Sequence, residues 1–267
     1  MLKRILFFAY GTLSYLIFLG TFLYAVCFIG NFGVPATLDG PAGGPLGVAF
    51  AIDAGLLALF AVQHSVMARK WFKERWTRVV PKPLERSTYV LFSSLALIFL
   101  FWQWRPLGGV VWSVEDPSAR FVLRGLFAFG WALVLISTFL INHFDLFGLR
   151  QVWLYLRGRP YTTLQFGTPG PYRIVRHPLY VGWFFAFWMT PTMTLAHLLF
   201  SVATTAYILL AIQFEERDLV REHGEAYESY RRRVPMLIPF AHRRGARTSG
   251  PSGVKTQSRK DLLVEKS

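Results

Sequence analysis

The chain has 267 residues, of which 53% are hydrophobic, 17% aromatic and 16% charged. A water-soluble protein carries about 25% charged residues, so this composition excludes that class and predicts an integral membrane protein with the lipid bilayer as a partner. The net charge of +14 would suggest nucleic acid for a soluble domain. In a membrane protein, the first explanation of such a charge is the excess of Lys and Arg in cytoplasmic loops. We therefore predict no nucleic-acid partner.

The first predicted element is the apolar run over residues 5–29, which follows Lys3 and Arg4. Its 25 residues are too many for the core of a signal peptide, and no clear cleavage site follows, so we interpret it as a retained transmembrane helix. The run contains Cys27, the single cysteine of the chain. One cysteine excludes an internal disulfide and a Cys-x-x-Cys site, and we predict no bound metal.

Four further apolar regions follow in the chain, over residues 46–66, 87–104, 121–142 and 179–214. The last is too long for one crossing, because its 36 residues would form a helix nearly twice as long as the hydrocarbon core of about 30 Å. Pro191 interrupts it and predicts a helical hairpin with its tip there, although the first arm is short for a full crossing. No β-hairpin signal or internal repeat occurs in the apolar regions.

These regions predict an all-α fold, a polytopic membrane helical bundle with about five membrane regions, the last of them the hairpin. Basic residues alternate between its loops. Two precede the first helix, seven lie in 67–86, five in 143–178 and twelve after Phe214, whereas none lies in 31–45 and three lie in 105–124. The positive-inside rule therefore places both termini in the cytoplasm, with 26 of the 29 Lys and Arg residues on that side.

This topology places several polar residues at or near the cytoplasmic helix ends, where soluble metabolites can reach them. They are His64, His143, Asp145, His177, Glu215 and Glu216. His197 instead follows the outward hairpin tip, and we interpret it as an interfacial residue with no role. Asp53 is the deepest acid, and an ionisable group within a span suggests function. We favour the simpler interpretation, a carboxylate near the outer end satisfied by water or a neighbouring helix.

The densest polar stretch, residues 170–182, marks the entry to the hairpin. Pro178 suits the first turn of a helix, where a missing N–H costs little. The free N–H groups of that turn, together with Arg173 and Arg176, would favour an anionic group such as a carboxylate or phosphate. For the two arginines alone, a positively charged loop at the membrane edge is the better explanation.

Glu215 and Glu216 stand at the other end of the hairpin. Because a hairpin returns its second arm beside its first, we expect both acids near Arg176, His177 and Tyr180. A carboxylate there could bind ribose hydroxyls or a cationic ligand, or it could form an ion pair with one of the nearby arginines. The spacing leaves these interpretations open.

These two stretches resemble the C-terminal signature of membrane methyltransferases, the superfamily of isoprenylcysteine carboxyl methyltransferase and the phospholipid N-methyltransferases. The matching residues are Gly170, Pro171, Tyr172, Arg176, His177, Pro178, Tyr180, Gly182, Glu215, Glu216, Leu219, Tyr227, Tyr230 and Pro235. The resemblance covers about residues 165–240 and is specific, because its elements recur in order across a membrane hairpin.

The rest of the chain narrows the resemblance. Residues 63–69, 85–90, 102–106 and 142–150 are similar to bacterial methanethiol S-methyltransferases, which extends the match to about residues 50–240. The resemblance implies transfer of a methyl group from S-adenosylmethionine to methanethiol, a small thiol, in the bacterial inner membrane with the site facing the cytoplasm. Related membrane proteins of unassigned role share parts of the N-terminal half.

The resemblance also implies which residues hold the cofactor. One wall of the S-adenosylmethionine site would comprise Tyr172, Arg173, Arg176, His177, Pro178, Tyr180 and Gly182, and the other Glu215 and Glu216. Because thiolate reacts and thiol does not, a base is also expected. The candidates are His64, His143 and Asp145, with Arg86 and Tyr89 as orienting groups. A histidine with a carboxylate partner would be oriented and more basic.

We therefore divide the chain into a methyltransferase domain over residues 1–240 and a basic tail over 241–267, which we expect to be disordered because it is polar and rich in Gly and Ser. Within the domain, residues 1–164 supply membrane helices and the substrate side, and 165–240 supply the cofactor-binding hairpin and an amphipathic end.

Two alternatives remain at this stage. A prenylcysteine carboxyl or phospholipid methyltransferase would need a large pocket open to the bilayer, whereas Trp102, Trp104, Trp183 and Trp188 could close a small one. A non-enzymatic accessory or transport protein would use its His and Glu residues to maintain structure. The sequence does not set the oligomeric state.

Overall fold

The structure is a computed structural model that describes residues 1–164 and 166–239. Within these residues, five helices are long and apolar enough to cross a membrane: α1 (Leu2–Gly30), α2 (Leu46–Ala68), α4 (Lys82–Gln103), α5 (Pro117–Ile141) and α9 (Leu195–His223). The predicted all-α class with five membrane regions is confirmed. The tail predicted over residues 241–267 lies outside the described part of the chain.

Shorter elements connect the long helices. They are α3 (Lys70–Trp76), β1 (Val110–Ser113), α6 (His143–Leu146), α7 (Leu149–Leu156), the 3-10 turn η1 (Gly170–Arg173), α8 (Pro178–Trp188), β2 (Thr192–Thr194) and α10 (Glu225–Arg233). β1 and β2 pair as an antiparallel ribbon, which joins the loop after α4 to the tip of the hairpin. The sequence showed no sign of this pairing, because its two strands are only four and three residues long.

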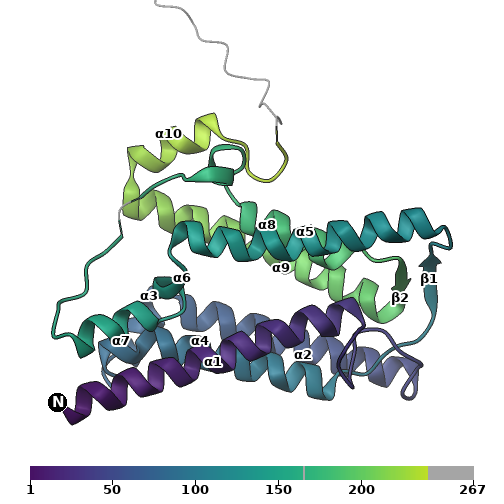
Figure 1. The fold of residues 1–267 in the computed structure, drawn as a ribbon, viewed down its shortest axis with the longest axis horizontal. Helices are drawn as coiled ribbons and strands as arrows, with labels where there is room; N and C mark the ends of the chain where they lie inside the picture. The colour runs from purple at the N-terminus through teal and green to yellow at the C-terminus, as the bar shows by residue number, and fades with distance from the viewer. Residues whose placement is uncertain (165, 240–267) are drawn as a thin grey trace, which may run out of the picture.

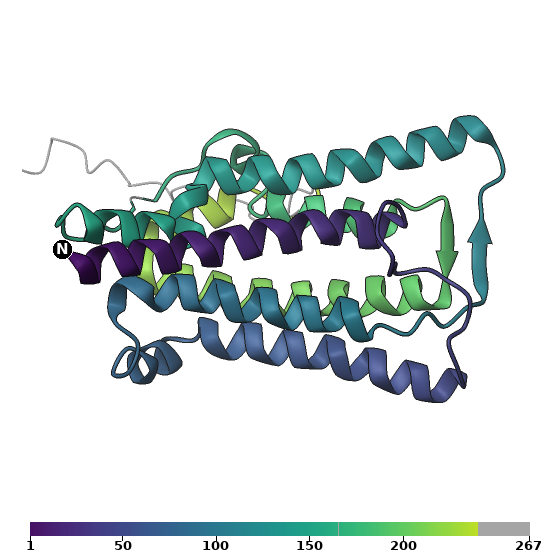
Figure 2. The same cartoon turned by 60° about the horizontal axis from the view of Figure 1, so that its bottom comes forward.

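The helices pack in two layers along a common axis (Figures 1 and 2). One layer contains α1, α2, α4 and α7, and the other contains α5, α8 and α9. We call the end with α3, α7 and α10 the basic end, and the end with β1 and β2 the ribbon end. The N-terminus lies at the basic end together with α10, as the alternation of basic loops requires.

The predicted hairpin is present, with α8 and α9 as its arms and Pro191 between them. α8 has 11 residues and is therefore about 16 Å long, about half the hydrocarbon thickness of about 30 Å. The chain then continues through β2 to the start of α9. The first arm is thus short, and as a helix alone it does not reach across the membrane.

Small residues let α8 lie close against α5. A Cβ atom at Gly130 would lie 2.6 Å from the backbone nitrogen of Ala186, and one at Gly182 would lie 2.8 Å from the carbonyl oxygen of Gly130. Such contacts are too short for any side chain, so both positions require glycine. Gly182 and Ala186 are four residues apart on α8, the spacing of small residues that lets membrane helices approach closely.

The two layers are joined at the ribbon end by an apolar core rich in aromatic rings. Phe28 of α1 packs on Phe101 of α4 with ring centroids 4.7 Å apart, and Phe187 of α8 packs on Phe200 of α9 at 5.2 Å. Trp104 lies between these groups and contacts Phe28 and Phe200 edge to face. Burial of these rings holds the layers together at this end.

His197 is buried at the ribbon end, with 1% of its surface exposed, so its interpretation as an interfacial residue is wrong. Its Nδ1 lies 3.0 Å from the Asp39 carboxylate and its Nε2 lies 2.9 Å from the carbonyl oxygen of Phe187. Both partners can accept a hydrogen bond, so each ring nitrogen of His197 lies against an acceptor. Thr194 also donates to Asp39, so this cluster ties the hairpin tip to the loop after α1.

Asp53 of α2 is fully buried near the ribbon end. One of its carboxylate oxygens accepts a hydrogen bond of 2.9 Å from the backbone N–H of Arg105, directly after α4. A neighbouring segment therefore supplies a partner for one oxygen of this acid and connects α2 to the end of α4. The other oxygen is buried and has no hydrogen-bond partner among the described residues.

Candidate active site

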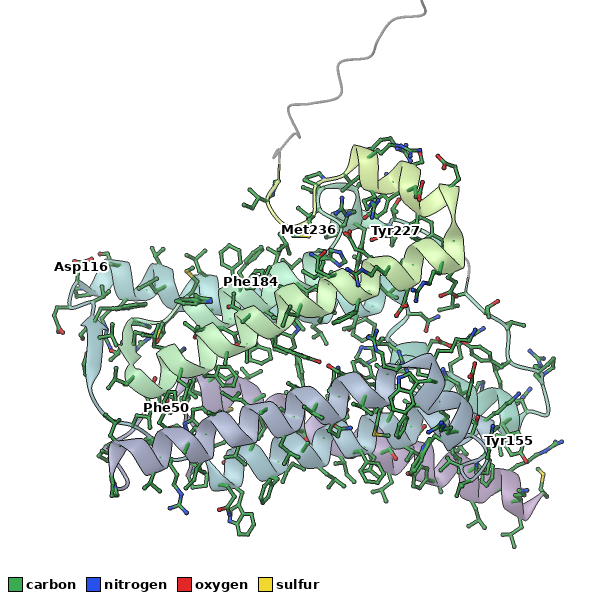
Figure 3. All side chains as sticks on the ribbon, turned by 180° about the vertical axis from the view of Figure 1, so that it is seen from behind. Phe50, Asp116, Tyr155, Phe184, Tyr227 and Met236 are labelled. Atoms are coloured by element: carbon green, nitrogen blue, oxygen red, sulfur yellow. The ribbon has the colours of Figure 1, made fainter. Side chains whose placement is uncertain are left out.

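A cavity of about 2160 Å³ lies between the two layers, and residues of both layers line it from the basic end to the aromatic rings near the ribbon end. Figure 3 shows the side chains of the two layers on either side of it. Pockets for small ligands usually measure about 300–1,000 Å³. This cavity therefore has room for more than one small molecule.

The entry to the hairpin forms a buried ionic cluster. Arg176 donates to Glu216 Oε1 through Nε at 2.7 Å, and His177 Nε2 donates to the same oxygen at 3.1 Å. The side chains of Arg176 and Glu216 are each 11% exposed. The hairpin thus brings Glu216 to both residues, as predicted, and Glu216 is the ion-pair partner of Arg176.

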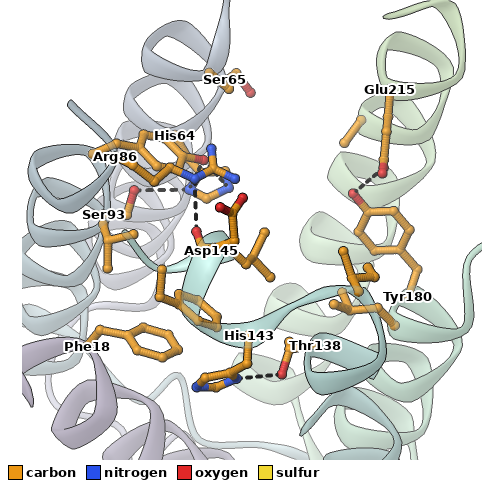
Figure 4. Close-up of a pocket in the computed structure, with 18 of the residues that line it drawn as sticks. Phe18, His64, Ser65, Arg86, Ser93, Thr138, His143, Asp145, Tyr180 and Glu215 are labelled. Atoms are coloured by element: carbon orange, nitrogen blue, oxygen red, sulfur yellow. Dashed lines mark hydrogen bonds between the residues drawn. The ribbon is translucent and has the colours of Figure 1, made fainter. Parts of the chain in front are cut away.

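Glu215 occupies a different position, although it is the adjacent residue. Its Oε2 accepts a hydrogen bond of 2.9 Å from the hydroxyl of Tyr180, and its side chain is 45% exposed. Figure 4 shows this pair on one wall of the cavity. Among the hydrogen bonds of the described residues, Oε1 of Glu215 has none, so this oxygen is free to accept one from a ligand.

The last turn of α10 and the residue after it hold the hairpin entry in place. Arg176 Nη1 donates to the carbonyl oxygens of Arg231 and Val234, both at 2.9 Å, and the Tyr230 hydroxyl donates to the carbonyl oxygen of Tyr172 at 2.6 Å. Burial raises the pKa of Tyr230 to about 12, so this hydroxyl remains a neutral donor at physiological pH. Burial and the nearby Glu215 also raise the pKa of Tyr172.

The residues predicted for the cofactor separate into two groups. Five of them line the cavity, namely Tyr172, Arg173, Arg176, His177 and Tyr180, and so does Glu215. Three others do not line it: Pro178, Gly182 and Glu216. Pro178 is the first residue of α8, a position that suits proline because no N–H is needed there. Gly182 provides the close contact with α5.

His64 lies on the opposite wall, on α2 (Figure 4). Its Nε2 is 2.8 Å from the hydroxyl of Tyr89 and its Nδ1 is 3.1 Å from the hydroxyl of Ser93. Either hydroxyl can donate while the other accepts, so two tautomers satisfy the same contacts. This arrangement lets the imidazole accept a proton on one nitrogen and release one from the other.

Arg86 places a positive charge on the same wall of the cavity. Its Nε donates to the carbonyl oxygen of Leu146 at 2.9 Å, and its guanidinium lies 5.5 Å from the centre of the Tyr89 ring. The bond to Leu146 connects the first turns of α4 to α6, the short helix that crosses between the layers. Arg86 and Tyr89 therefore adjoin His64, as expected for orienting groups.

His143 begins α6 and is 4% exposed. The hydroxyl of Thr138 donates to the carbonyl oxygen of Leu135, so Nδ1 of His143 must donate to Thr138, at 2.8 Å. Nε2 then accepts from the hydroxyl of Tyr15 at 2.9 Å. Burial also lowers the pKa of His143. Both nitrogens of this neutral ring are occupied by protein partners, and the contacts join α1 to α5.

Asp145 pairs with residues other than the predicted histidines. It accepts from Arg150 Nη1 at 2.8 Å and from the hydroxyl of Tyr161 at 3.2 Å. Burial and, after it, the contact with Asp145 raise the pKa of Tyr161. Among the described residues, the hydrogen bonds of His64 and His143 go to hydroxyl groups, so the expected histidine–carboxylate pair does not form.

Several cavity residues were not recognised from the sequence. The hydroxyls of Tyr207 and Ser65 lie 3.0 Å apart and join α9 to α2, and Arg69 pairs with Asp218 at 3.4 Å nearer the basic end. Phe166 contributes an aromatic ring that contacts His223 at 5.1 Å. Two signals were available, the isolated Tyr207 in the apolar run of α9 and the resemblance over residues 63–69, but the contacts themselves depend on how the layers meet.

The four tryptophans considered as pocket walls have different roles. Trp183 lines the cavity. Trp104 is buried at the ribbon end, where it donates to the carbonyl oxygen of Leu38, and Trp188 donates to Thr205. Trp102 is 74% exposed on the outside of the bundle. These residues do not reduce the cavity to a small pocket.

Comparison with known proteins finds close relatives. The chain is 60% identical over 239 residues to a methanethiol S-methyltransferase of Crocosphaera subtropica, with 90% of this chain and 94% of the relative covered. It is 54% identical over 242 residues to a methanethiol S-methyltransferase of Mycobacterium tuberculosis, with 91% and 99% covered. Nurim of Mus musculus is 33% identical over 178 residues, with 63% and 67% covered. No family model and no solved structure matches the chain.

Proposed function

The chain belongs to the family of methanethiol S-methyltransferases, and we propose that it transfers a methyl group from S-adenosylmethionine to methanethiol and releases dimethyl sulfide. The observation that supports this most is one cavity with two chemically different walls. A carboxylate, arginines and tyrosines lie on the hairpin side, and a histidine with hydroxyl partners lies on the α2 and α4 side.

The hairpin wall suits the polar groups of S-adenosylmethionine. The free oxygen of Glu215 can accept from a ribose hydroxyl or the α-ammonium group, and the exposed Arg173 can pair with the carboxylate. The rings of Tyr172 and Phe166 line the same region and offer surfaces for a purine. When bound, the cofactor supplies a methyl group attached to a sulfonium sulfur. The sulfide that leaves needs no protonation by an acid.

Glu216 and His177 are proposed to position this wall. Glu216 does not line the cavity, and its carboxylate receives hydrogen bonds from both Arg176 and His177. This cluster joins the two residues before α8 to α9, and so it sets the distance between Tyr180 and Glu215. A change in it would alter the cofactor site without removing a direct contact.

His64 is proposed to accept the proton of the thiol. Even a cysteine thiol, with a pKa of about 8.5, is mostly protonated at neutral pH, and the thiolate is the nucleophile. His64 can take the proton because its two hydroxyl partners permit either tautomer. Arg86 is cationic and adjoins Tyr89, so it would stabilise negative charge on the sulfur. His143 and Asp145 are proposed to fix α6 beside this group.

The two walls would hold donor and acceptor facing each other. Alignment of two reactants in a fixed geometry can supply about 7–11 kcal/mol of an activation barrier. The walls belong to different layers, and these are joined near the cavity by the contact between Tyr207 and Ser65. The relative position of the layers therefore sets the distance between the reacting atoms.

The basic end is proposed to face the cytoplasm of a bacterial cell, with the protein in the inner membrane. The positive-inside rule supports this orientation. S-adenosylmethionine, a soluble metabolite, would reach the cavity from that side. Methanethiol is small and apolar enough to arrive through the bilayer.

Product analysis tests the proposal. Purified protein in lipid nanodiscs would receive S-adenosylmethionine with a labelled methyl group and methanethiol, and gas chromatography with mass spectrometry would detect labelled dimethyl sulfide. Parallel reactions with a prenylcysteine and with phospholipid test the alternative acceptors. Label in either of these, without labelled dimethyl sulfide, would contradict the proposal.

A further inference from the structure

The cavity continues well beyond the groups that the proposed reaction uses. We define the deep chamber as the part of the cavity on the ribbon side of His64. Its walls include Phe22, Leu57, Leu97, Phe101, Phe187 and Phe200. All six are apolar, and they come from both layers of the bundle.

The helices set the length of the deep chamber. Along α2, Leu57 lies seven residues from His64 toward the ribbon end, which corresponds to about 10 Å. Along α4, Phe101 lies 12 residues beyond Tyr89, which corresponds to about 18 Å. The deep chamber therefore extends at least about 10 Å past the proposed base.

The polar groups on the walls of the deep chamber are already engaged. The hydroxyls of Thr21, Ser94 and Thr204 each donate to a carbonyl oxygen of their own helix, at 2.7, 2.9 and 2.6 Å. A ligand in this space would meet apolar side chains and hydroxyls without a free proton. The deep chamber therefore favours a hydrocarbon chain over a polar molecule.

Methanethiol has one carbon and one sulfur and would leave the deep chamber unfilled. We infer that the deep chamber holds the alkyl chain of longer apolar thiols, so that the protein also S-methylates straight-chain thiols of about four to eight carbons. An extended chain of eight carbons is about 10 Å long, which matches the shorter wall. This inference rests on the proposed function.

The reaction would be the same for the longer acceptor. The thiol gives its proton to His64, its sulfur forms a bond to the methyl carbon, and the bond from that carbon to the sulfonium sulfur breaks. The products are a methyl alkyl sulfide and the demethylated donor. No oxidant or reductant is needed.

Two substitutions would shorten the deep chamber. Ala61 lines the cavity on α2 between Leu57 and His64, so Ala61→Phe would place a ring in the path of the chain. Leu97→Trp would add bulk from α4, the neighbouring helix of the same layer. Ala58→Phe is the matched control, because Ala58 is exposed on the same helix and does not line the cavity.

The experiment compares thiols of one, four, six and eight carbons in the same nanodiscs and measures each methyl sulfide by mass spectrometry. Wild-type protein should methylate all of them. Ala61→Phe and Leu97→Trp should lower the ratio of kcat/KM for hexanethiol to that for methanethiol at least about tenfold, because each displaced methylene is worth about fourfold. Ala58→Phe should keep the wild-type ratio. Because every variant is measured in the same lipid, partitioning of the thiols into the bilayer cancels.

The inference would be overturned if wild-type protein methylates methanethiol and none of the longer thiols. An equal loss for every chain length in both cavity variants, with the proteins folded by size-exclusion chromatography, would also overturn it. Loss of methanethiol turnover in wild-type protein would instead contradict the proposed function, so the two failures are distinguishable.

Discussion

The ribbon end and the basic end are built from the same long helices but use their polar residues differently. At the ribbon end, Asp39 receives hydrogen bonds from three side chains, and aromatic rings fill the space between the layers. Nearer the basic end, the layers are separated by the cavity, and Glu215 and His64 face it. The polar groups of the ribbon end hold the fold together, whereas Glu215 and His64 nearer the basic end face the cavity.

Three histidines show how this difference arises. Both nitrogens of His197 face acceptors, a carboxylate and a carbonyl oxygen, whereas His143 donates from one nitrogen and accepts at the other. His64 has two hydroxyl partners that permit either tautomer. The partners that surround a histidine, more than its depth in the membrane, determine whether it can move a proton. Four substitutions or conditions test this contrast.

Glu216→Gln should have the largest effect. It removes the negative charge between Arg176 and His177, and breaking a buried ion pair costs about 3–5 kcal/mol. We expect a large fall in the temperature of unfolding and weaker binding of S-adenosylmethionine, measured by thermal denaturation and calorimetry.

Glu215→Gln is the matched control for this change, since its side chain is 45% exposed. It should weaken cofactor binding with little change in stability. Equal losses of stability in both variants would remove the distinction between the positioning acid and the ligand-facing acid.

His64→Ala should lower the turnover of methanethiol about 100-fold at neutral pH, the lower end of what a general base contributes. Affinity for S-adenosylmethionine should change little, because His64 lies on the opposite wall. Turnover should partly recover at high pH, where the thiol ionises without help. A pH profile of kcat measures this.

Asp145→Asn and His143→Gln serve as comparisons, and both should reduce turnover less than His64→Ala. Asp145 is paired with Arg150, and both nitrogens of His143 are occupied. Near-normal turnover in all three variants would mean that the protein captures thiolate already formed in solution.

Asp39→Asn should act on stability alone. His197, Thr194 and Asn31 would lose an ionised partner, and a buried hydrogen-bonding group left without its partner costs about 1–3 kcal/mol. The unfolding temperature should fall while kcat/KM for methanethiol stays at the wild-type value. Glu115→Gln, an exposed acid at the same end, should change neither. Lower kcat/KM in folded Asp39→Asn protein would show that the ribbon end also shapes the site.

The smallest effect should come from pH. Burial lowers the pKa of His143, so the folded protein favours its neutral ring. Above the ordinary histidine pKa of about 6.5 the ring is neutral in both the folded and the unfolded chain, so its contribution to folding stability is complete. As the pH falls below that value, the unfolded chain binds the proton more readily and this contribution is lost. Thermal denaturation between pH 8 and pH 5 should therefore show a decline that is smaller in His143→Gln. An identical decline in the variant would assign it to other groups.

The sequence was sufficient to predict the parts of the fold that depend on local composition. A run of about 20 apolar residues predicts a membrane helix wherever it occurs in a chain. Pro191 interrupts the last and longest run, which predicts a hairpin there. The hairpin then required Glu215 and Glu216 to return beside Arg176 and Tyr180, and the structure shows these contacts. Connectivity alone implied this proximity, because the arms of a hairpin lie side by side.

The tertiary structure decided which of two adjacent acids is buried, which histidine has partners that permit either tautomer, and how much space lies between the layers. Glu215 and Glu216 are one helical step apart and so point in different directions, but only the packed neighbours show which one faces the cavity. The partners of His64, His143 and His197 come from other helices, at separations of 25 to 158 residues for Tyr89, Tyr15 and Asp39. Hydrogen bonds are short and directional, so such partners are set by how helices distant in the chain pack, whereas apolar length is a property of each segment alone.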